Sequence, residues 1–146
     1  MYTILIVDDE RPAQTFLKAI CQKYCPAFDT ILLSGSADDA LRLMAQQHVH
    51  VLVTDISMPG INGIELAQRV RQLYPRTHTV IVSGYAEFEF ARGAIQAGVD
   101  DYLLKPVEIQ SFRQILDRIR ETLDEEANDL MEETLTCLLC GEAVDE

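Results

Sequence analysis

The chain has 146 residues, 48% of them hydrophobic, and a formal net charge of −12. This composition supplies a core for one domain of ordinary size and excludes a largely disordered chain. The longest apolar runs are far shorter than the ~20 residues of a membrane-spanning helix, and the N-terminus lacks the basic start and cleavage site of a signal peptide. We therefore expect a cytoplasmic protein without membrane attachment.

The negative charge is concentrated at the C-terminal end. Residues 1–120 contain all 12 Lys and Arg against 14 Asp and Glu, whereas residues 121–146 contain ten acidic residues and no basic one. Neither part offers the clustered basic side chains that bind nucleic-acid phosphates. Any DNA binding must therefore belong to another domain.

Short β-rich runs alternate with helical segments along the chain. Apolar, partly β-branched runs predict strands at residues 3–7, 30–33, 51–54, 79–82 and 102–104. Apolar residues spaced by three and four predict helices at residues 11–25, 37–47, 62–73 and 88–96, and a last helix from about residue 107. Because the strands are apolar without alternation, a parallel sheet covered on both faces is favoured. We predict an α/β fold, a flavodoxin-like, doubly wound five-stranded sheet of order 2-1-3-4-5.

The last helix is predicted to be unusually long. Its apolar stripe begins at Ile109, thins after Leu123 and persists to Leu135. Such a helix would extend past a compact domain as a stalk. Pairing of two stalks in a coiled coil would be interrupted by Glu126 and Glu133.

Four cysteines form two local pairs, Cys21 with Cys25 and Cys137 with Cys140. The spacing of the second pair also occurs in zinc and redox sites. A cytosolic protein keeps its thiols reduced, and a structural zinc site needs four ligands. We therefore expect neither metal binding nor redox chemistry from them.

Polar residues follow four of the predicted strands at their carboxyl ends. They are Asp8 and Asp9, Asp55, Ser83 and Lys105. In an open α/β sheet this edge binds ligands, and in the order 2-1-3-4-5 the first and third strands are neighbours. The three carboxylates should converge there, where their mutual repulsion favours a bound cation. An oxygen cluster with few protein ligands suits Mg²⁺.

One acid at such a position is more often a helix cap or a solvated loop residue, but the combination favours a functional site. Acids, a lysine and a hydroxyl around Mg²⁺ are equipped for phosphoryl transfer. The carboxylate of Asp55 can serve as the nucleophile. Lys105 would then pair with phosphate oxygens, and Ser83 would donate a hydrogen bond to one of them.

These stretches resemble the receiver domain of bacterial two-component response regulators. The similarity covers roughly residues 1–120, and its motifs lie at residues 4–10, 55–63, 83–85 and 101–106. It implies that Asp55 is the phosphorylation site. It also implies an Mg²⁺ site formed by Asp9 directly, by Asp8 partly through water, by Asp55 and by the backbone carbonyl of Ser57.

The resemblance also assigns the residues that respond to phosphorylation. Ser83 matches the switch hydroxyl, Lys105 the phosphate-binding lysine, and Tyr102 the aromatic residue that turns inward when Ser83 moves. In this family the peptide bond before Pro106 is cis, the arrangement that proline permits. The resemblance further implies that the phosphate donor is a sensor histidine kinase. It also implies that the face built from the fourth helix, fifth strand and fifth helix then pairs with a partner or with a second copy.

Residues 83–106 and the acidic tail are similar to a narrower group, the regulators with an AraC-type helix-turn-helix effector. We therefore expect a receiver domain at residues 1–120 and an acidic helical linker at residues 121–146 that leads to a missing DNA-binding effector.

Two other functions share some of these features. A phosphatase of the haloacid-dehalogenase type also forms an aspartyl phosphate beside Mg²⁺, but it needs an acidic residue where this chain has Ser57. An interaction module that is never phosphorylated would not need the three acids and Lys105. The sequence therefore favours a phosphoacceptor with limited self-phosphorylation and self-dephosphorylation over an enzyme.

Overall fold

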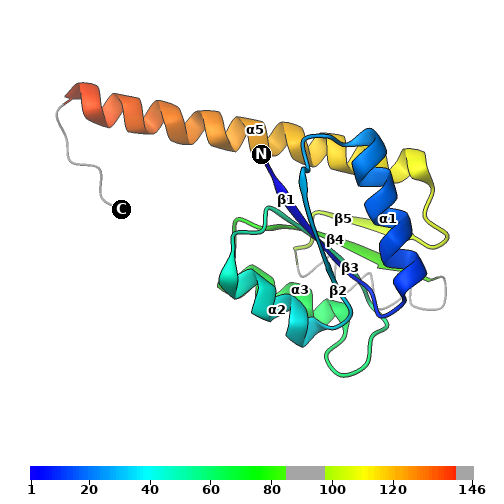
Figure 1. The fold of residues 1–146 in the computed structure, drawn as a ribbon. Helices are drawn as coiled ribbons and strands as arrows, with labels where there is room; N and C mark the ends of the chain where they lie inside the picture. The colour runs from blue at the N-terminus through cyan, green and yellow to red at the C-terminus, as the bar shows by residue number, and fades with distance from the viewer. Residues whose placement is uncertain (85–97, 141–146) are drawn as a thin grey trace.

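The computed structural model describes residues 1–84 and 98–140. Five parallel strands form one sheet in the order β2-β1-β3-β4-β5 (Figure 1). The strands are β1 (Thr3–Val7), β2 (Thr30–Ser34), β3 (Val51–Asp55), β4 (His78–Ser83) and β5 (Asp101–Leu104). The predicted sheet and its strand order are confirmed.

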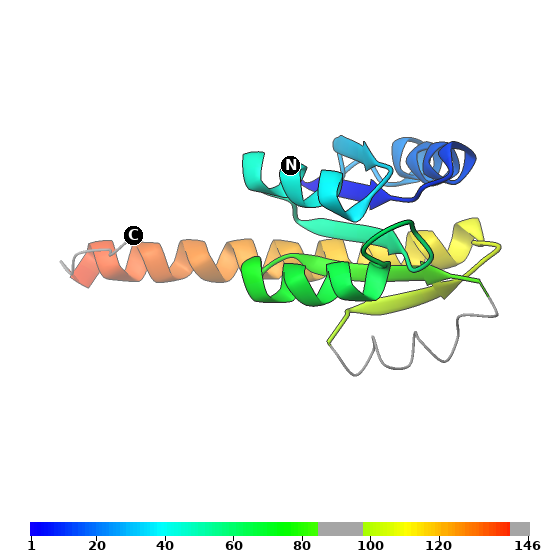
Figure 2. The same cartoon turned by 90° about the horizontal axis from the view of Figure 1, so that it is seen from below.

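Helices cover both faces of this sheet. They are α1 (Arg11–Tyr24), α2 (Ala37–Gln46), α3 (Gly63–Leu73) and α5 (Ile109–Cys140). Figures 1 and 2 show α1 and α5 on one face and α2 and α3 on the other. The helix predicted at residues 88–96 lies outside the described residues.

The central strand β1 shows why the sheet needs both layers. Ile4 and Ile6 pack in a core with residues of α1 and α5, whereas Leu5 and Val7 pack in a second core with residues of α2 and α3. All four side chains are at most 1% exposed. Successive side chains of a strand point to opposite faces, so an apolar run without alternation requires cover on both sides.

Local sequence signals set most helix starts. The Ser36 Oγ atom accepts a hydrogen bond from the Asp39 backbone N–H at 3.2 Å and so caps the start of α2. Asn62 caps α3 by accepting from the N–H groups of Ile64 and Glu65, each at 3.0 Å. Such caps satisfy backbone donors that have no partner within the helix. The Asn62-Gly63 pair therefore opens a helix rather than a hairpin.

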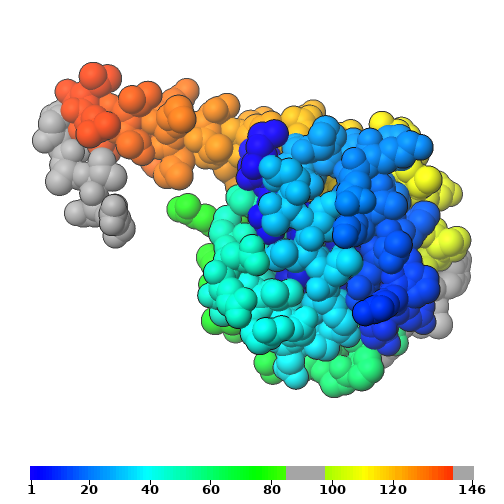
Figure 3. Space-filling view, viewed as in Figure 1, coloured from blue at the N-terminus to red at the C-terminus, as the bar shows by residue number. Residues whose placement is uncertain are grey.

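The carboxyl-terminal helix α5 runs far beyond the body of the domain, as predicted. Leu123 is the last of its residues in the core, at 5% exposure. Beyond it the helix projects from the rounded body as a stalk (Figure 3), which we define as residues 124–140. Its apolar side chains Leu130, Met131 and Leu135 are more than half exposed. Across residues 1–84 and 98–140, no helix has the length and apolar character needed to cross a membrane.

Two buried thiols lie where α1 packs on the sheet. Cys21 and Cys25 are free and belong to the core shared by α1 and α5. Burial raises the pKa of Cys21 to about 12. A thiol with so high a pKa stays protonated and unreactive near neutral pH, which agrees with a packing role.

Candidate functional site

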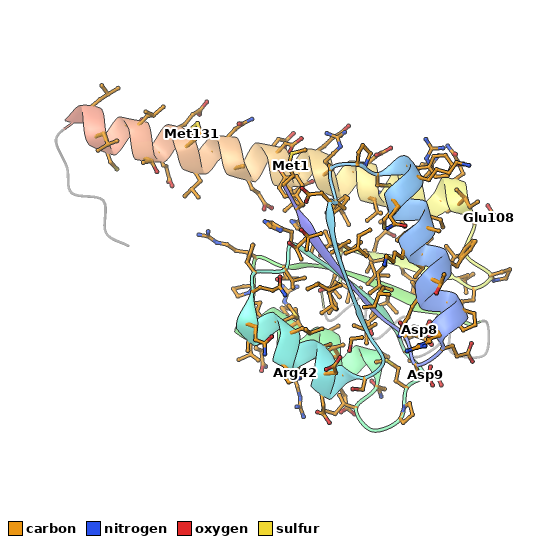
Figure 4. The ribbon with its side chains drawn as sticks, in the orientation of Figure 1. Met1, Asp8, Asp9, Arg42, Glu108 and Met131 are labelled. Carbon is orange, nitrogen blue, oxygen red and sulfur yellow. The ribbon has the colours of Figure 1, made fainter. Side chains whose placement is uncertain are left out.

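Three carboxylates meet at the carboxyl edge of the sheet. Asp8 and Asp9 directly follow β1, and Asp55 is the last residue of the neighbouring strand β3. One oxygen atom from each carboxylate lies within 4.8 Å of the others. Asp8 and Asp55 are only 2% and 6% exposed, whereas Asp9 is exposed. The predicted convergence of these acids is therefore present, at the turn into α1 where Figure 4 labels Asp8 and Asp9.

The amino group of Lys105 lies between two of these carboxylates. Its Nζ atom is 3.2 Å from Oδ2 of Asp8 and 3.2 Å from Oδ2 of Asp55. Burial alone would lower the pKa of Lys105, but the carboxylates of Asp55 and Asp8 outweigh it and hold that pKa above 10.5. Lys105 is therefore a permanent cation that offsets part of the charge of the acid cluster.

The backbone around Lys105 fixes where its side chain enters the site. The Lys105 N–H donates to the carbonyl oxygen of Ser83 at 2.7 Å, which extends the pairing of β4 and β5 by one residue. The peptide bond between Lys105 and Pro106 is cis. Lys105 thus follows β5 directly and reaches across the sheet edge to Asp55.

A side chain of α1 that the sequence did not single out holds Asp8 in place. The Gln14 side-chain amide donates to the carbonyl oxygens of Asp8 and Ser34, at 2.6 and 3.1 Å. The Glu10 backbone N–H donates to Oδ1 of Asp8 at 2.9 Å. These bonds leave Oδ2 of Asp8 directed at Lys105. A polar residue in the first turns of a helix is ordinarily on the surface, so nothing in the sequence marked Gln14.

Gly63 allows α3 to approach the end of β3 at Asp55 closely. A Cβ atom at this position would lie 2.0 Å from the backbone oxygen of Asp55. The Gly63 N–H also donates to the carbonyl oxygen of Ile56 at 2.9 Å. Only glycine permits a contact this short, so the start of α3 is fixed against the end of β3. Ser57, predicted to offer its carbonyl oxygen to a metal, lies exposed in the loop between them.

Ser83 and Tyr102 form a direct pair on adjacent strands. Their hydroxyl oxygens are 2.7 Å apart, and Ser83 is fully buried. In the register of β4 and β5, Tyr102 is opposite Ile81, two residues before Ser83. The sequence pointed to both residues but not to the hydrogen bond between them.

The cluster's chemistry fits a hard divalent cation and a phosphoryl group. Its donors are carboxylate oxygens, the ligands that Mg²⁺ prefers, and one of them is open to solvent. A fixed lysine lies beside the buried acids, and the whole group occupies the ligand-binding edge of a doubly wound sheet. Fold and site together define a doubly wound α/β domain with an acidic pocket and a lysine at the ligand-binding edge of its sheet.

The fold and the acidic pocket are those of a known protein family. Residues 4–117 match the response regulator receiver domain, and the chain belongs to this family. Members of this class are signalling phosphoacceptors rather than enzymes that act on external substrates.

Two curated relatives are transcriptional regulators. The chain is 33% identical to the uncharacterized transcriptional regulatory protein YesN of Bacillus subtilis over 119 residues, which cover 82% of this chain and 32% of that protein. It is 36% identical to the transcriptional regulatory protein HptR of Staphylococcus aureus over 126 residues, which cover 86% of this chain and 49% of that protein. The chain therefore spans about a third to a half of the length of these relatives.

Solved structures of other receiver domains share the fold. The receiver domain of AraT, a response regulator from Geobacillus stearothermophilus, aligns with a TM-score of 0.79 at 31% identity, covering 86% of this chain and 98% of that one. A two-component transcriptional regulator, AraC, from Clostridium phytofermentans aligns with a TM-score of 0.76 at 29% identity, covering 86% of this chain and 97% of that one.

Proposed function

We propose that this receiver domain accepts a phosphoryl group on Asp55 from a sensor histidine kinase, with Mg²⁺ bound beside it, and so switches a downstream effector. One observation carries the proposal. A buried carboxylate, Asp55, lies in a cluster with two further acids, and the Lys105 amino group lies 3.2 Å from it. Because its surroundings supply both a cation site and a fixed positive charge, Asp55 is the acid best placed to receive a phosphoryl group.

The metal would be held by oxygen atoms from the two strand ends. Asp8, Asp9 and Asp55 would supply carboxylate oxygens, and Ser57 its backbone carbonyl. When bound, Mg²⁺ neutralises negative charge on the transferring phosphoryl group.

The transfer itself needs only a positioned nucleophile and charge balance. A carboxylate oxygen of Asp55 forms a bond to phosphorus while the P–N bond to the kinase's phosphohistidine breaks, and the imidazole keeps the electron pair. Lys105, which contacts both Asp8 and Asp55 before the reaction, would exchange its contact with Asp55 for a phosphate oxygen. Its contact with Asp8 can persist throughout.

The hydrogen bond between Ser83 and Tyr102 suggests how the new phosphate is detected. The two hydroxyl oxygens are 2.7 Å apart and either can be the donor, and Ser83 Oγ also lies 3.4 Å from the carbonyl oxygen of Gly84. When Ser83 moves to donate to a phosphate oxygen, its contact with Tyr102 would weaken, and Tyr102 would change its position on β5. The hydrogen bond between Ser83 and Tyr102 would therefore oppose the switch.

The altered surface would be the face formed by β5, α5 and the helix predicted at residues 88–96. An ion pair between Asp101 on β5 and Arg118 on α5 already joins two of these elements. We propose that this face binds a second copy of the chain or another partner once Asp55 is phosphorylated.

The effector is proposed to be an AraC-type DNA-binding domain that follows this chain. Support comes from the relatives, which are longer transcriptional regulators, and from the receiver match, which ends at residue 117. On this proposal residues 1–120 are the receiver, and residues 121–146 are an acidic linker that does not itself bind DNA.

Intact-mass measurement tests the phosphorylation directly. The protein is incubated with acetyl phosphate and Mg²⁺, and we expect one added phosphoryl group, absent when a chelator removes the metal. The Asp55→Asn variant should gain none, whereas Asp38→Asn, a control on the surface of α2, should behave as the unaltered chain. Unchanged mass, or equal labelling of Asp55→Asn, would refute the proposal.

A further inference from the structure

All three histidines of the chain lie at the amino edge of the sheet, opposite the acid cluster. His48, His50 and His78 line a groove of about 670 Å³ that also includes residues of the stalk and of the end of α3. His50 precedes β3, and its carbonyl oxygen accepts a hydrogen bond from the His78 N–H at 2.9 Å, where β4 begins. The groove is remote from Asp55 and takes no part in the proposed phosphorylation.

His78 contacts a carboxylate with each of its ring nitrogens. Nδ1 lies 3.1 Å from Oδ1 of Asp100, and Nε2 lies 3.2 Å from Oε1 of Glu126. A neutral imidazole has one N–H donor, and its other nitrogen is an acceptor that repels a carboxylate oxygen. Both contacts are therefore favourable together only when the ring is protonated.

The two carboxylates differ in how firmly they are held. Oδ2 of Asp100 accepts a hydrogen bond from the Thr79 N–H at 2.7 Å, which fixes Asp100 against β4. Glu126 belongs to the stalk, three residues beyond the last core residue of α5, and its side chain is 51% exposed. On loss of one proton, the remaining N–H therefore stays with Asp100, and the contact with Glu126 is lost.

Other charged and titratable groups around His78 come from every neighbouring element. They are Asp100 before β5, Glu126, Asp129 and Glu133 on α5, His48 and His50 before β3, Tyr2 before β1, and Arg71 and Arg76 at and after the end of α3. His50 does not compete for the proton, because its Nδ1 accepts the Thr3 N–H at 3.0 Å and burial lowers its pKa. Arg71 is engaged with the carbonyl oxygen of Gly98 at 2.7 Å. The balance of charge facing His78 is negative.

We infer that His78 is a proton-operated latch that ties the stalk to the sheet at Glu126 when protonated and releases Glu126 when neutral. Asp124, earlier in the same turn, accepts a hydrogen bond from the Tyr2 hydroxyl, and this contact does not depend on His78. Among the described residues, Glu126 is the last along α5 whose side chain forms a hydrogen bond or ion pair with the body. Loss of the contact between His78 and Glu126 would lengthen the part of α5 that does not contact the body. It would thereby change the position of any domain attached to the end of the stalk. Proton concentration would thus act on the same helix that carries the signal of Asp55, through a separate site.

The direction of the pH dependence follows from the contacts. The hydrogen bond to Asp100 raises the pKa of His78 above 6.5, with burial opposing this and the charges of Asp100 and Glu126 adding to it. A raised pKa stabilises the protonated form in the folded chain. The latch is therefore closed below pH 6.5 and opens as the pH rises through the raised pKa of His78.

Nuclear magnetic resonance on the unphosphorylated full chain tests the latch. Long-range ¹H–¹⁵N spectra give the pKa of His78, and ¹⁵N heteronuclear NOE values report the order of residues 124–139. The unaltered chain should show a His78 pKa above 6.5 and NOE values that fall as the pH rises through this pKa.

Glu126→Gln should weaken proton binding by His78 about two- to fivefold and give low NOE values at every pH. Glu125→Gln removes the same charge from the neighbouring exposed residue and should leave both readouts unchanged.

Three results would overturn the inference: a His78 pKa at or below 6.5, a Glu126→Gln variant that titrates like the unaltered chain, or stalk NOE values independent of pH. Because Asp55 takes no part in this experiment, these results leave the proposed phosphorylation untouched.

Discussion

Gly63 lies close against the backbone of Asp55, so even its replacement by alanine should destabilise the domain. In Gly63→Ala, the new Cβ atom would lie 2.0 Å from the carbonyl oxygen and 2.8 Å from the carbonyl carbon of Asp55. Both are backbone atoms, which cannot turn aside as a flexible side chain can. The start of α3 must therefore shift away from the end of β3, and Asp55 with it.

The sign of the change in the free energy of unfolding distinguishes a tight contact at Gly63 from free space. Alanine is favoured over glycine within a helix by up to about 1 kcal/mol, so a site with free space would be stabilised by this change. Forcing an extra carbon into a packed site destabilises by roughly 1–3 kcal/mol, and more when backbone must move. We expect Gly63→Ala to lower the free energy of unfolding by about 2 kcal/mol, equivalent to roughly 4–8 °C in Tm.

Urea and thermal unfolding measure this, with Gly35→Ala as the matched control. A Cβ atom at Gly35 meets nothing within 4 Å. Gly35→Ala should therefore change the free energy of unfolding by no more than about 0.5 kcal/mol. The rate of labelling by acetyl phosphate should fall in Gly63→Ala and not in Gly35→Ala. A Gly63→Ala variant as stable as the unaltered chain, or more stable, would refute this account of the junction between β3 and α3.

Two further predictions concern contacts around the site. A double-mutant cycle with Ser83→Ala and Tyr102→Phe should give a coupling free energy of about 1 kcal/mol for their hydrogen bond, and zero coupling would contradict it. Lys105→Met should lose about 2 kcal/mol of stability without Mg²⁺, because Asp8 and Asp55 lose their cation, and added Mg²⁺ should stabilise this variant more than the unaltered chain. Since the pKa of Lys105 is raised above 10.5, the difference should be full below that pH for as long as the carboxylates stay ionised, and it should vanish as the pH rises through the raised value. Equal stabilisation of both proteins by Mg²⁺ would contradict this prediction.

Much of the acid cluster could be predicted because the carboxyl ends of parallel strands all lie at the same edge of the sheet. Once β1 and β3 are neighbours, residues at their carboxyl ends must meet, which brings Asp8 and Asp9 to Asp55. The same rule carries Lys105 to this edge from β5. These inferences needed only the strand pattern and the sheet order.

The remaining contacts depend on packing between distant segments and leave no local pattern. The Gln14 amide reaches Ser34 only because α1 crosses the end of β2. His78 and Glu126 are 48 residues apart and meet because α5 runs back along the sheet to its amino edge. β4 also begins one residue earlier than predicted, since the His78 N–H pairs with His50.

The position of the phosphoryl group tests the central claim most directly. After reaction with acetyl phosphate and Mg²⁺, the acyl phosphate is reduced with borohydride, and peptide sequencing by mass spectrometry locates the modified residue. We predict reduction to homoserine at Asp55 alone, and no reduction when Mg²⁺ is removed. Modification at Asp8, Asp9 or another carboxylate instead of Asp55, or none in the presence of Mg²⁺, would contradict it.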